Sequence, residues 1–178
     1  VRGKRTREIK DEQLDRALAM APDLVTIFSG TNDVVARRFA VGELAEDIGE
    51  IHDRLIGAGA TVVTFTLPDL SPVMPLARLV RDRVEALNHA IQTVGARSGA
   101  RVVDVAGVPV ASDPRLWSED RLHANAAGHA RIAAALAQAI NLPGASDGWS
   151  EPLARLPPPT PLAWARAELR WGTKYLAP

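Results

Sequence analysis

Apolar and polar residues follow two alternating patterns along most of the chain. Short continuous runs rich in β-branched residues, typical of strands buried on both faces, occur at residues 24–29 (LVTIFS), 61–66 (TVVTFT) and 101–106 (RVVDVA). Around these runs, apolar residues recur every three or four positions, as on one face of a helix. This spacing predicts helices over residues 10–20, 43–57, 76–97 and 125–140.

The alternation of strands and helices predicts a parallel sheet, because each return to such a sheet needs a crossover and its strands are covered on both faces. The expected fold class is α/β, a three-layer α/β/α sandwich of the flavodoxin-like kind. A doubly wound sheet usually has about five strands, and the pattern shows fewer. We therefore expect the first strands of the sheet to precede Val1, and an open apolar edge where they are missing.

The composition changes near Leu142, where a stretch dense in Pro and Gly begins. Such a stretch favours neither helix nor strand and indicates an ordered wrap or a linker. We divide the chain into a core domain, residues 1–141, and a Pro-rich C-terminal extension, residues 142–178. Within the extension, residues 162–171 (LAWARAELRW) have the pattern of a short helix, which we expect to fold back on the domain; a membrane-surface or partner-binding helix is the alternative.

Composition and charge exclude several classes of function. The 178 residues, 47% of them apolar, suffice for the core of one domain, and the 21 basic and 21 acidic side chains cancel, so affinity for nucleic acid has no electrostatic basis. The lack of cysteine excludes thiolate catalysis and disulfides, and it leaves the compartment open, with a slight preference for the cytoplasm. No apolar run approaches the roughly 20 residues of a membrane span, so no transmembrane segment is expected.

Gly30-Thr31-Asn32-Asp33 directly follows the first predicted strand. The sequence therefore places it at the carboxyl end of a parallel strand, where open α/β sheets bind ligands. Gly30 allows a sharp turn, and the Asn32 amide can donate hydrogen bonds to a developing oxyanion. A simple polar turn is the alternative interpretation.

Asp120 and His123 lie after the last predicted strand and just before a helix that begins near Asn125. A carboxylate held against an imidazole fixes its tautomer and stabilises the imidazolium that forms when the ring accepts a proton from a hydroxyl nucleophile. Capping of the helix is the alternative role.

The remaining candidate residues indicate no second kind of site. His52, His89 and His129 lie in predicted helices without the spacing of paired metal ligands, so we expect no metal and assign them to the surface or to packing. No nucleotide-binding motif is present, and no cofactor is expected. Seven serines occur, none in a Gly-x-Ser-x-Gly motif, and Ser29 ends a predicted buried strand.

Three segments resemble sequence blocks of the SGNH hydrolases, a family of GDSL-like esterases and lipases. PDLVTIFSGTND resembles the third block, SEDRLHANAAGH resembles the fifth, and VRGKRT resembles the tail of the second. The resemblance implies the flavodoxin-like SGNH fold and a serine ester hydrolase that works through an acyl-enzyme. Its substrates would be small acyl esters or esters of lipids or carbohydrates.

The same resemblance implies a role for four residues. His123 would be the general base and acid, oriented by Asp120, while the Asn32 side chain and the Gly3 backbone N–H would bind the oxyanion. The family's Gly-Asp-Ser block, which supplies the nucleophile, has no counterpart in the chain. We expect that block upstream of Val1, and we expect the 178-residue fragment alone to be nearly inactive.

Two other classes of function stay open. One is a non-catalytic α/β module that binds a ligand or a partner through the same loops. The other is a flavodoxin-like or response-regulator domain, which would need a phosphate-binding loop or an acidic pocket at the start of the sheet. The sequence carries no signal for the oligomeric state.

Overall fold

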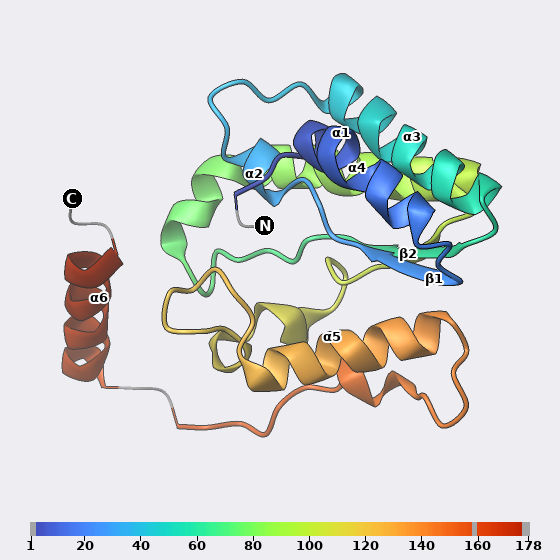
Figure 1. Ribbon diagram of the computed structural model, residues 1–178. Helices are drawn as coiled ribbons and strands as arrows, with labels where there is room; N and C mark the ends of the chain where they lie inside the picture. Colours follow the sequence, from blue (N-terminus) through green and yellow to red (C-terminus); the bar gives the residue numbers. More distant parts are fainter. Residues whose placement is uncertain (1–2, 158–159, 176–178) are drawn as a thin grey trace.

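The computed structural model describes residues 3–157 and 160–175, and its centre is a small parallel sheet (Figure 1). The sheet has the order β1-β2-β3, with Leu24 opposite Thr61 and Val63 opposite Arg101. The strands are β1 (Leu24–Ile27), β2 (Thr61–Phe65) and β3 (Arg101–Val103). All three lie within the predicted runs, and the predicted parallel arrangement is confirmed.

Helices connect and flank these strands. The described α-helices are α1 (Thr6–Ala19), α2 (Thr31–Val34), α3 (Val41–Gly57), α4 (Arg81–Ser98), α5 (Ala126–Ala139) and α6 (Pro161–Tyr175). Short 3-10 helices are η1 (Pro75–Val80), η2 (Pro109–Ser112), η3 (Pro114–Leu116) and η4 (Asp147–Ser150).

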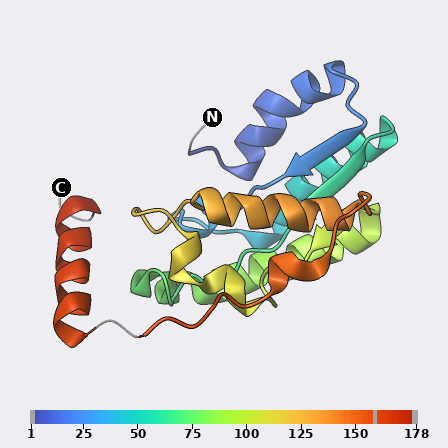
Figure 2. The ribbon, with the colours of Figure 1, turned by 90° about the horizontal axis from the view of Figure 1, so that it is seen from below.

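The helices form two layers around the sheet. Figure 1 shows α1, α3 and α4 on one face of the sheet and α5 on the other, and Figure 2 shows the molecule from the side of α5. Ile27 and Val62 pack under Leu55 of α3 in one apolar cluster, whereas Val63 packs with Ala135 of α5 in another. The predicted three-layer α/β/α sandwich is therefore confirmed.

Local hydrogen bonds set the element boundaries that differ from the predicted ones. α1 begins at Thr6 instead of residue 10, because the Arg5 N–H donates to the Glu8 carboxylate at 2.9 Å and so caps the first turn. β3 ends at Val103, because the Val105 N–H donates back to the Val103 carbonyl at 3.0 Å in a tight turn.

β1 differs from the prediction of a strand buried on both faces. It is one of the two edge strands of the described sheet, and Leu24 is 44% exposed. Phe28, just beyond the end of β1, is 53% exposed. The physical reason is that α5 packs beside β3, so its cover does not extend to β1. A shallow apolar groove of ≈ 190 Å³, lined in part by Ile9 of α1 and Val25, runs along this edge.

The C-terminal extension first wraps around α5 and then leaves the sandwich. Trp149 donates its indole N–H to Gln138 of α5 at 2.5 Å, and Arg131 donates to the Glu151 carbonyl at 2.8 Å. The predicted helix at 162–171 is confirmed as part of α6. In the described parts of the chain, no helix has both the length and the apolar character required to span a membrane.

Candidate active site

The two polar motifs singled out in the sequence lie at one edge of the sheet. β1 and β3 run parallel, so the segments that follow them, with α2 after β1 and residues 104–125 after β3, start from the same edge. Figure 1 shows α2 and the loop before α5 at this end of the molecule, on opposite sides of the sheet. In open α/β sheets this carboxyl edge is the position of ligand sites.

Gly30 makes the sharp turn from β1 into α2. Its φ of +102° lies in the left-handed region that favours glycine. A Cβ atom at this position would also lie 2.6 Å from Cδ2 of the buried Leu87. Both the backbone conformation and the contact with Leu87 therefore favour glycine here, two residues before Asn32.

Asn32 and Asp33 hold the N-terminal segment of the described chain. The Asn32 side-chain amide donates to the Lys4 carbonyl at 2.9 Å, and Asp33 accepts from both the backbone N–H and the hydroxyl of Thr6 at 3.0 Å. The structure thus brings Asn32 to the segment that contains Gly3, although Val1 and Arg2 of the VRGKRT motif lie outside the described residues. An amide group carries two N–H donors, so the bond to Lys4 uses one of them.

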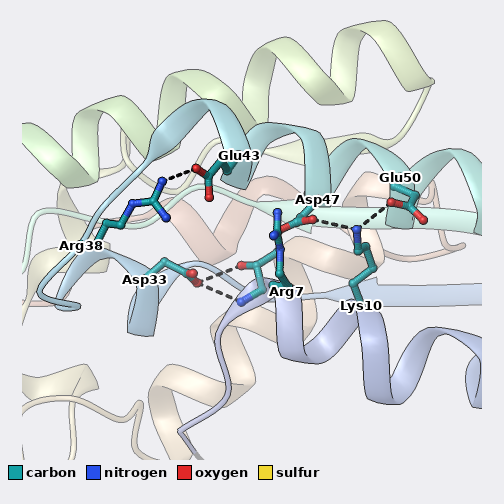
Figure 3. A network of polar contacts seen from close by, with 8 residues as sticks. Arg7, Lys10, Asp33, Arg38, Glu43, Asp47 and Glu50 are labelled. Atoms are coloured by element: carbon teal, nitrogen blue, oxygen red, sulfur yellow. Dashed lines mark hydrogen bonds and ion pairs between the residues drawn. The ribbon is translucent and has the colours of Figure 1, made fainter.

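Ion pairs between α1 and α3 fix this N-terminal segment further (Figure 3). Asp47 of α3 is only 4% exposed, and it pairs with Lys10 at 2.8 Å and with Arg7 at 3.0 Å. Burial alone would raise the pKa of Asp47, but the hydrogen bonds from Lys10 and Arg7 hold that pKa below its usual range. The carboxylate is therefore charged at neutral pH and ties α1 to α3.

A polar hollow of ≈ 650 Å³ opens beside the same segment. Gly3 and Asp33 border it, and the Arg38–Glu43 ion pair shown in Figure 3 lies in its wall. The hollow provides space for a small ligand beside Gly3.

Asp120 and His123 form a hydrogen-bonded pair in the loop before α5. Nδ1 of His123 lies 2.8 Å from Oδ2 of Asp120. Oδ1 of Asp120 accepts from the backbone N–H groups of Leu122 and His123 at 3.0 and 3.1 Å. Burial would raise the pKa of Asp120, but these hydrogen bonds hold the pKa below its usual range. The carboxylate therefore remains ionised beside the imidazole.

A different residue caps α5. Oδ1 of Asn125 accepts from the Gly128 N–H at 3.1 Å, and Nδ2 of Asn125 donates to the Arg115 carbonyl at 2.8 Å. Capping of this helix therefore does not account for Asp120 and His123. Gly128 allows α5 to approach the loop closely, because a Cβ atom there would lie 2.3 Å from the Leu116 carbonyl oxygen.

The two motifs lie at the same edge of the sheet, and each has its own hydrogen-bond partners. Within the described residues, no hydrogen bond joins Asn32 to Asp120 or His123, and no serine hydroxyl is bonded to His123. The His123 side chain is 62% exposed. Several serines have other partners: Ser71 bonds to Asp69, Ser98 to His52, and Ser118 to the Ala124 carbonyl.

The other histidines lie in helices α3, α4 and α5. His52 is fully buried between α3 and α4, where its Nδ1 lies 3.2 Å from the Ser98 hydroxyl, whereas His89 and His129 are exposed. Among the residues that the structure describes, no group of three His, Cys, Asp or Glu side chains is arranged to bind a metal ion.

Sequence reasoning missed the residues that hold the motifs in place. Lys4 and Thr6 are separated from Asn32 and Asp33 by 28 and 27 positions, and no local pattern marks them as partners. Arg121, which lies between Asp120 and His123, bonds to a glutamate 47 positions away.

Comparison with known proteins identifies a family. Residues 1–131 match the sequence model of the GDSL-like Lipase/Acylhydrolase family. No curated protein matches the sequence.

Several solved structures have a similar fold. LAE5, an alpha/beta hydrolase enzyme from the metagenome of Lake Arreo, is 24% identical with a TM-score of 0.65, covering 78% of this chain and 69% of that one. A GDSL-like lipase from Bacteroides thetaiotaomicron is 18% identical with a TM-score of 0.65, covering 78% and 72%. Axe2, an acetylxylan esterase from Geobacillus stearothermophilus, is 17% identical with a TM-score of 0.66, covering 82% and 71%. At these identities the likeness shows the fold.

Proposed function

Because the chain belongs to the GDSL-like lipase/acylhydrolase family, we propose that it carries the histidine and oxyanion parts of a serine ester hydrolase. One observation carries this proposal most directly. An ionised Asp120 holds His123 at 2.8 Å, at the same edge of the sheet where Asn32 is bonded to the N-terminal segment. A base with a fixed tautomer and a set of N–H donors are the two parts that acyl transfer needs besides a nucleophile.

The proposed reaction proceeds in two steps through an acyl-enzyme. Asp120 accepts the Nδ1–H of His123, which leaves Nε2 free to take the proton of a serine hydroxyl as its oxygen attacks the ester carbonyl carbon. The C–O bond to the alcohol then breaks, and the leaving oxygen takes the proton from Nε2. Water repeats the attack through Nε2, the acid is released, and the serine regains its proton.

The negative charge formed on the carbonyl oxygen needs hydrogen-bond donors. In our proposal the second N–H of the Asn32 amide and the backbone N–H of Gly3 supply them. The bond from Asn32 to the Lys4 carbonyl supports this role, since it fixes the amide plane next to Gly3 before a substrate arrives. Preorganised donors of this kind need no rearrangement during the reaction.

Within the described residues, no serine hydroxyl lies in hydrogen-bond contact with His123 to act as the nucleophile. We propose that a serine upstream of Val1, in a strand next to β1, fills this role. The half-exposed Phe28 and the apolar groove along β1 support a neighbouring element at this edge. The partners of Ser71, Ser98 and Ser118 argue against those serines.

The proposed substrates are carboxylic esters, either of lipids or carbohydrates or of other small alcohols. The GDSL-like lipase and the acetylxylan esterase among the similar structures bear names consistent with this range. No step of the proposed mechanism runs through a cofactor or a metal ion.

The deciding experiment compares the natural protein with the 178-residue chain in a p-nitrophenyl acetate assay, together with N-terminal sequencing. We expect a longer natural protein that carries Gly-Asp-Ser, hydrolyses the ester and is labelled on that serine by a fluorophosphonate. The 178-residue chain should show neither hydrolysis nor labelling. A natural protein that starts near Val1 and hydrolyses no ester would instead support a non-catalytic binding module.

A further inference from the structure

Helix α6 stands apart from the three layers of the sandwich. Figures 1 and 2 both show it beside the body, facing the loop that precedes α5. Most of its residues are exposed, and Glu168, Trp171 and Gly172 are the half-buried ones. Within the described chain, the ion pairs that join α6 to the sandwich end on Glu119 and Arg121.

Arg121 is held by two different interactions with α6. Its guanidinium group donates to both carboxylate oxygens of Glu168, at 2.8 and 2.7 Å, and lies 4.5 Å from the ring centroid of Trp171. Bidentate and cation–π contacts of this kind fix a guanidinium in both direction and plane. The hydrogen bond from Arg121 holds the pKa of Glu168 below its usual range, which keeps the pair charged at neutral pH. A third contact, between Lys174 and Glu119 at 2.8 Å, lies beside this pair.

The backbone conformation of Arg121 connects its side chain to the geometry of the Asp120–His123 pair. Its φ of +62° lies in the left-handed region, which a residue with a Cβ atom rarely adopts. The next two N–H groups, those of Leu122 and His123, are the ones that Asp120 accepts. A change of φ at Arg121 would alter the direction of these N–H groups relative to the carboxylate.

We propose that α6 is a brace that keeps Asp120 and His123 aligned, with Glu168 and Trp171 as positioning residues that act through Arg121. The proposal rests on the proposed function for its catalytic meaning, but the effect on the loop is measurable without turnover. It also gives the C-terminal extension, residues 142–178, a task within the chain: its wrap around α5 delivers α6 to the loop.

The test is amide hydrogen exchange on the full chain, read by NMR at Leu122 and His123. Glu168→Gln removes the charge with little change of shape, and Trp171→Leu removes the ring. We expect exchange at the two amides to rise about tenfold in each variant, while the amides of Val62 and Val63 in β2 keep their rates. Glu46→Gln, the same chemical change at an exposed position of α3, is the matched control. It should leave the exchange rates of the loop amides and of the β2 amides unchanged. Rates within about twofold of the parent in both α6 variants would overturn the brace.

Arg121→Gly separates the side chain from the backbone conformation. Glycine adopts φ +62° without strain, so a loop that depended only on its backbone would stay protected in this variant. We expect instead the same rise in exchange as in Glu168→Gln, and no further rise when the two changes are combined. Protection at the parent level in Arg121→Gly would contradict the proposal.

Kinetic measurements on the longer protein that carries the Gly-Asp-Ser serine, called the serine-bearing protein below, then distinguish the proposed role of α6 from the proposed esterase function. Glu168→Gln should lower kcat about tenfold with KM within about twofold, because misalignment of the base affects the chemical step more than substrate binding. An unchanged kcat despite faster exchange would overturn the positioning role. A natural protein without esterase activity would refute the proposed function, while the exchange rates would still decide whether α6 holds the loop.

Discussion

Asp120 uses one carboxylate oxygen for the His123 ring, at 2.8 Å, and the other for the backbone N–H groups of Leu122 and His123. The same group therefore shapes the turn and orients the imidazole. Because the backbone bonds orient the carboxylate toward the ring, the loop favours the tautomer of His123 that carries the proton on Nδ1.

The tautomer of His123 is the first measurable consequence. At pH 7.5 we expect 15N NMR to show the proton on Nδ1 in the parent chain, since Asp120 accepts it there. Asp120→Ala removes that acceptor, so both tautomers should become populated, as for a histidine in water. The exposed His89 is the internal reference, and a parent His123 that resembled it would contradict the predicted orientation.

His123→Ala removes the proposed base. In the serine-bearing protein we expect the acylation rate on a p-nitrophenyl ester to fall by more than about a thousandfold. His129→Ala, a change at an exposed position on α5, is the control and should leave the rate unchanged. Full kcat in His123→Ala would show that another group accepts the proton.

Asn32→Ala tests the oxyanion donor. We expect kcat to fall roughly a hundredfold or more, because a side-chain donor aimed at the developing charge is lost. KM should change much less, since this bond strengthens mainly in the transition state. Arg37→Gln, at an exposed position just after α2, provides the control. A variant that raised only KM would assign Asn32 to substrate binding.

Gly128→Ala should destabilise the fold. The added Cβ would lie 2.3 Å from the Leu116 carbonyl, so α5 must move away from the loop, at a cost of roughly 1–3 kcal/mol. Urea unfolding measures this difference. Gly42→Ala in α3 meets no atom within 4 Å and should be neutral or stabilising by up to about 1 kcal/mol. Equal stability of the two variants would show that the close approach is not tight.

His52 makes the stability of the fold depend on pH. Burial lowers its pKa to about 4, with a further contribution from Arg97 and an opposing one from Asp53. The unfolded chain has the ordinary pKa of about 6.5 and binds the proton first as the pH falls. The stabilisation is therefore complete above pH 6.5 and is lost as the pH falls toward 4, by up to about 3 kcal/mol.

The measurement is urea unfolding at pH 7.5 and at pH 5, where only part of that loss is expected. His52→Leu should be less dependent on pH over this interval, while His89→Gln should behave like the parent because its ring is exposed. The same pH dependence in His52→Leu and the parent would show that other groups cause the loss.

Local pattern was enough to predict most of the fold. The runs at 24–29, 61–66 and 101–106 contain the observed strands, because β-branched residues that fill a buried sheet are recognisable one strand at a time. The exposure of β1 was not predictable in this way. It depends on where α5 packs, and that is a property of the assembled layers.

In the candidate site, too, local pairings could be predicted from the sequence and long-range partners could not. Asp120 and His123 lie three residues apart, so their pairing follows from local geometry, and Gly30 and Asn32 share one turn. The bonds from Asn32 to Lys4 and from Arg121 to Glu168 join segments 28 and 47 residues apart. Such partners are selected by the fold, and a single sequence does not reveal them.

The attachment of α6 through charged groups makes the two parts of the molecule respond to salt in opposite directions. Dissolved ions screen the Lys174–Glu119 pair, whose side chains are 52% and 66% exposed. Sulfate would strengthen the burial of apolar side chains beneath α3 and α5 at the same time. Added sulfate therefore weakens one of the contacts that hold the C-terminal helix while it stabilises the sandwich, so that, with α6 as a brace, the alignment of His123 depends on the surrounding solution.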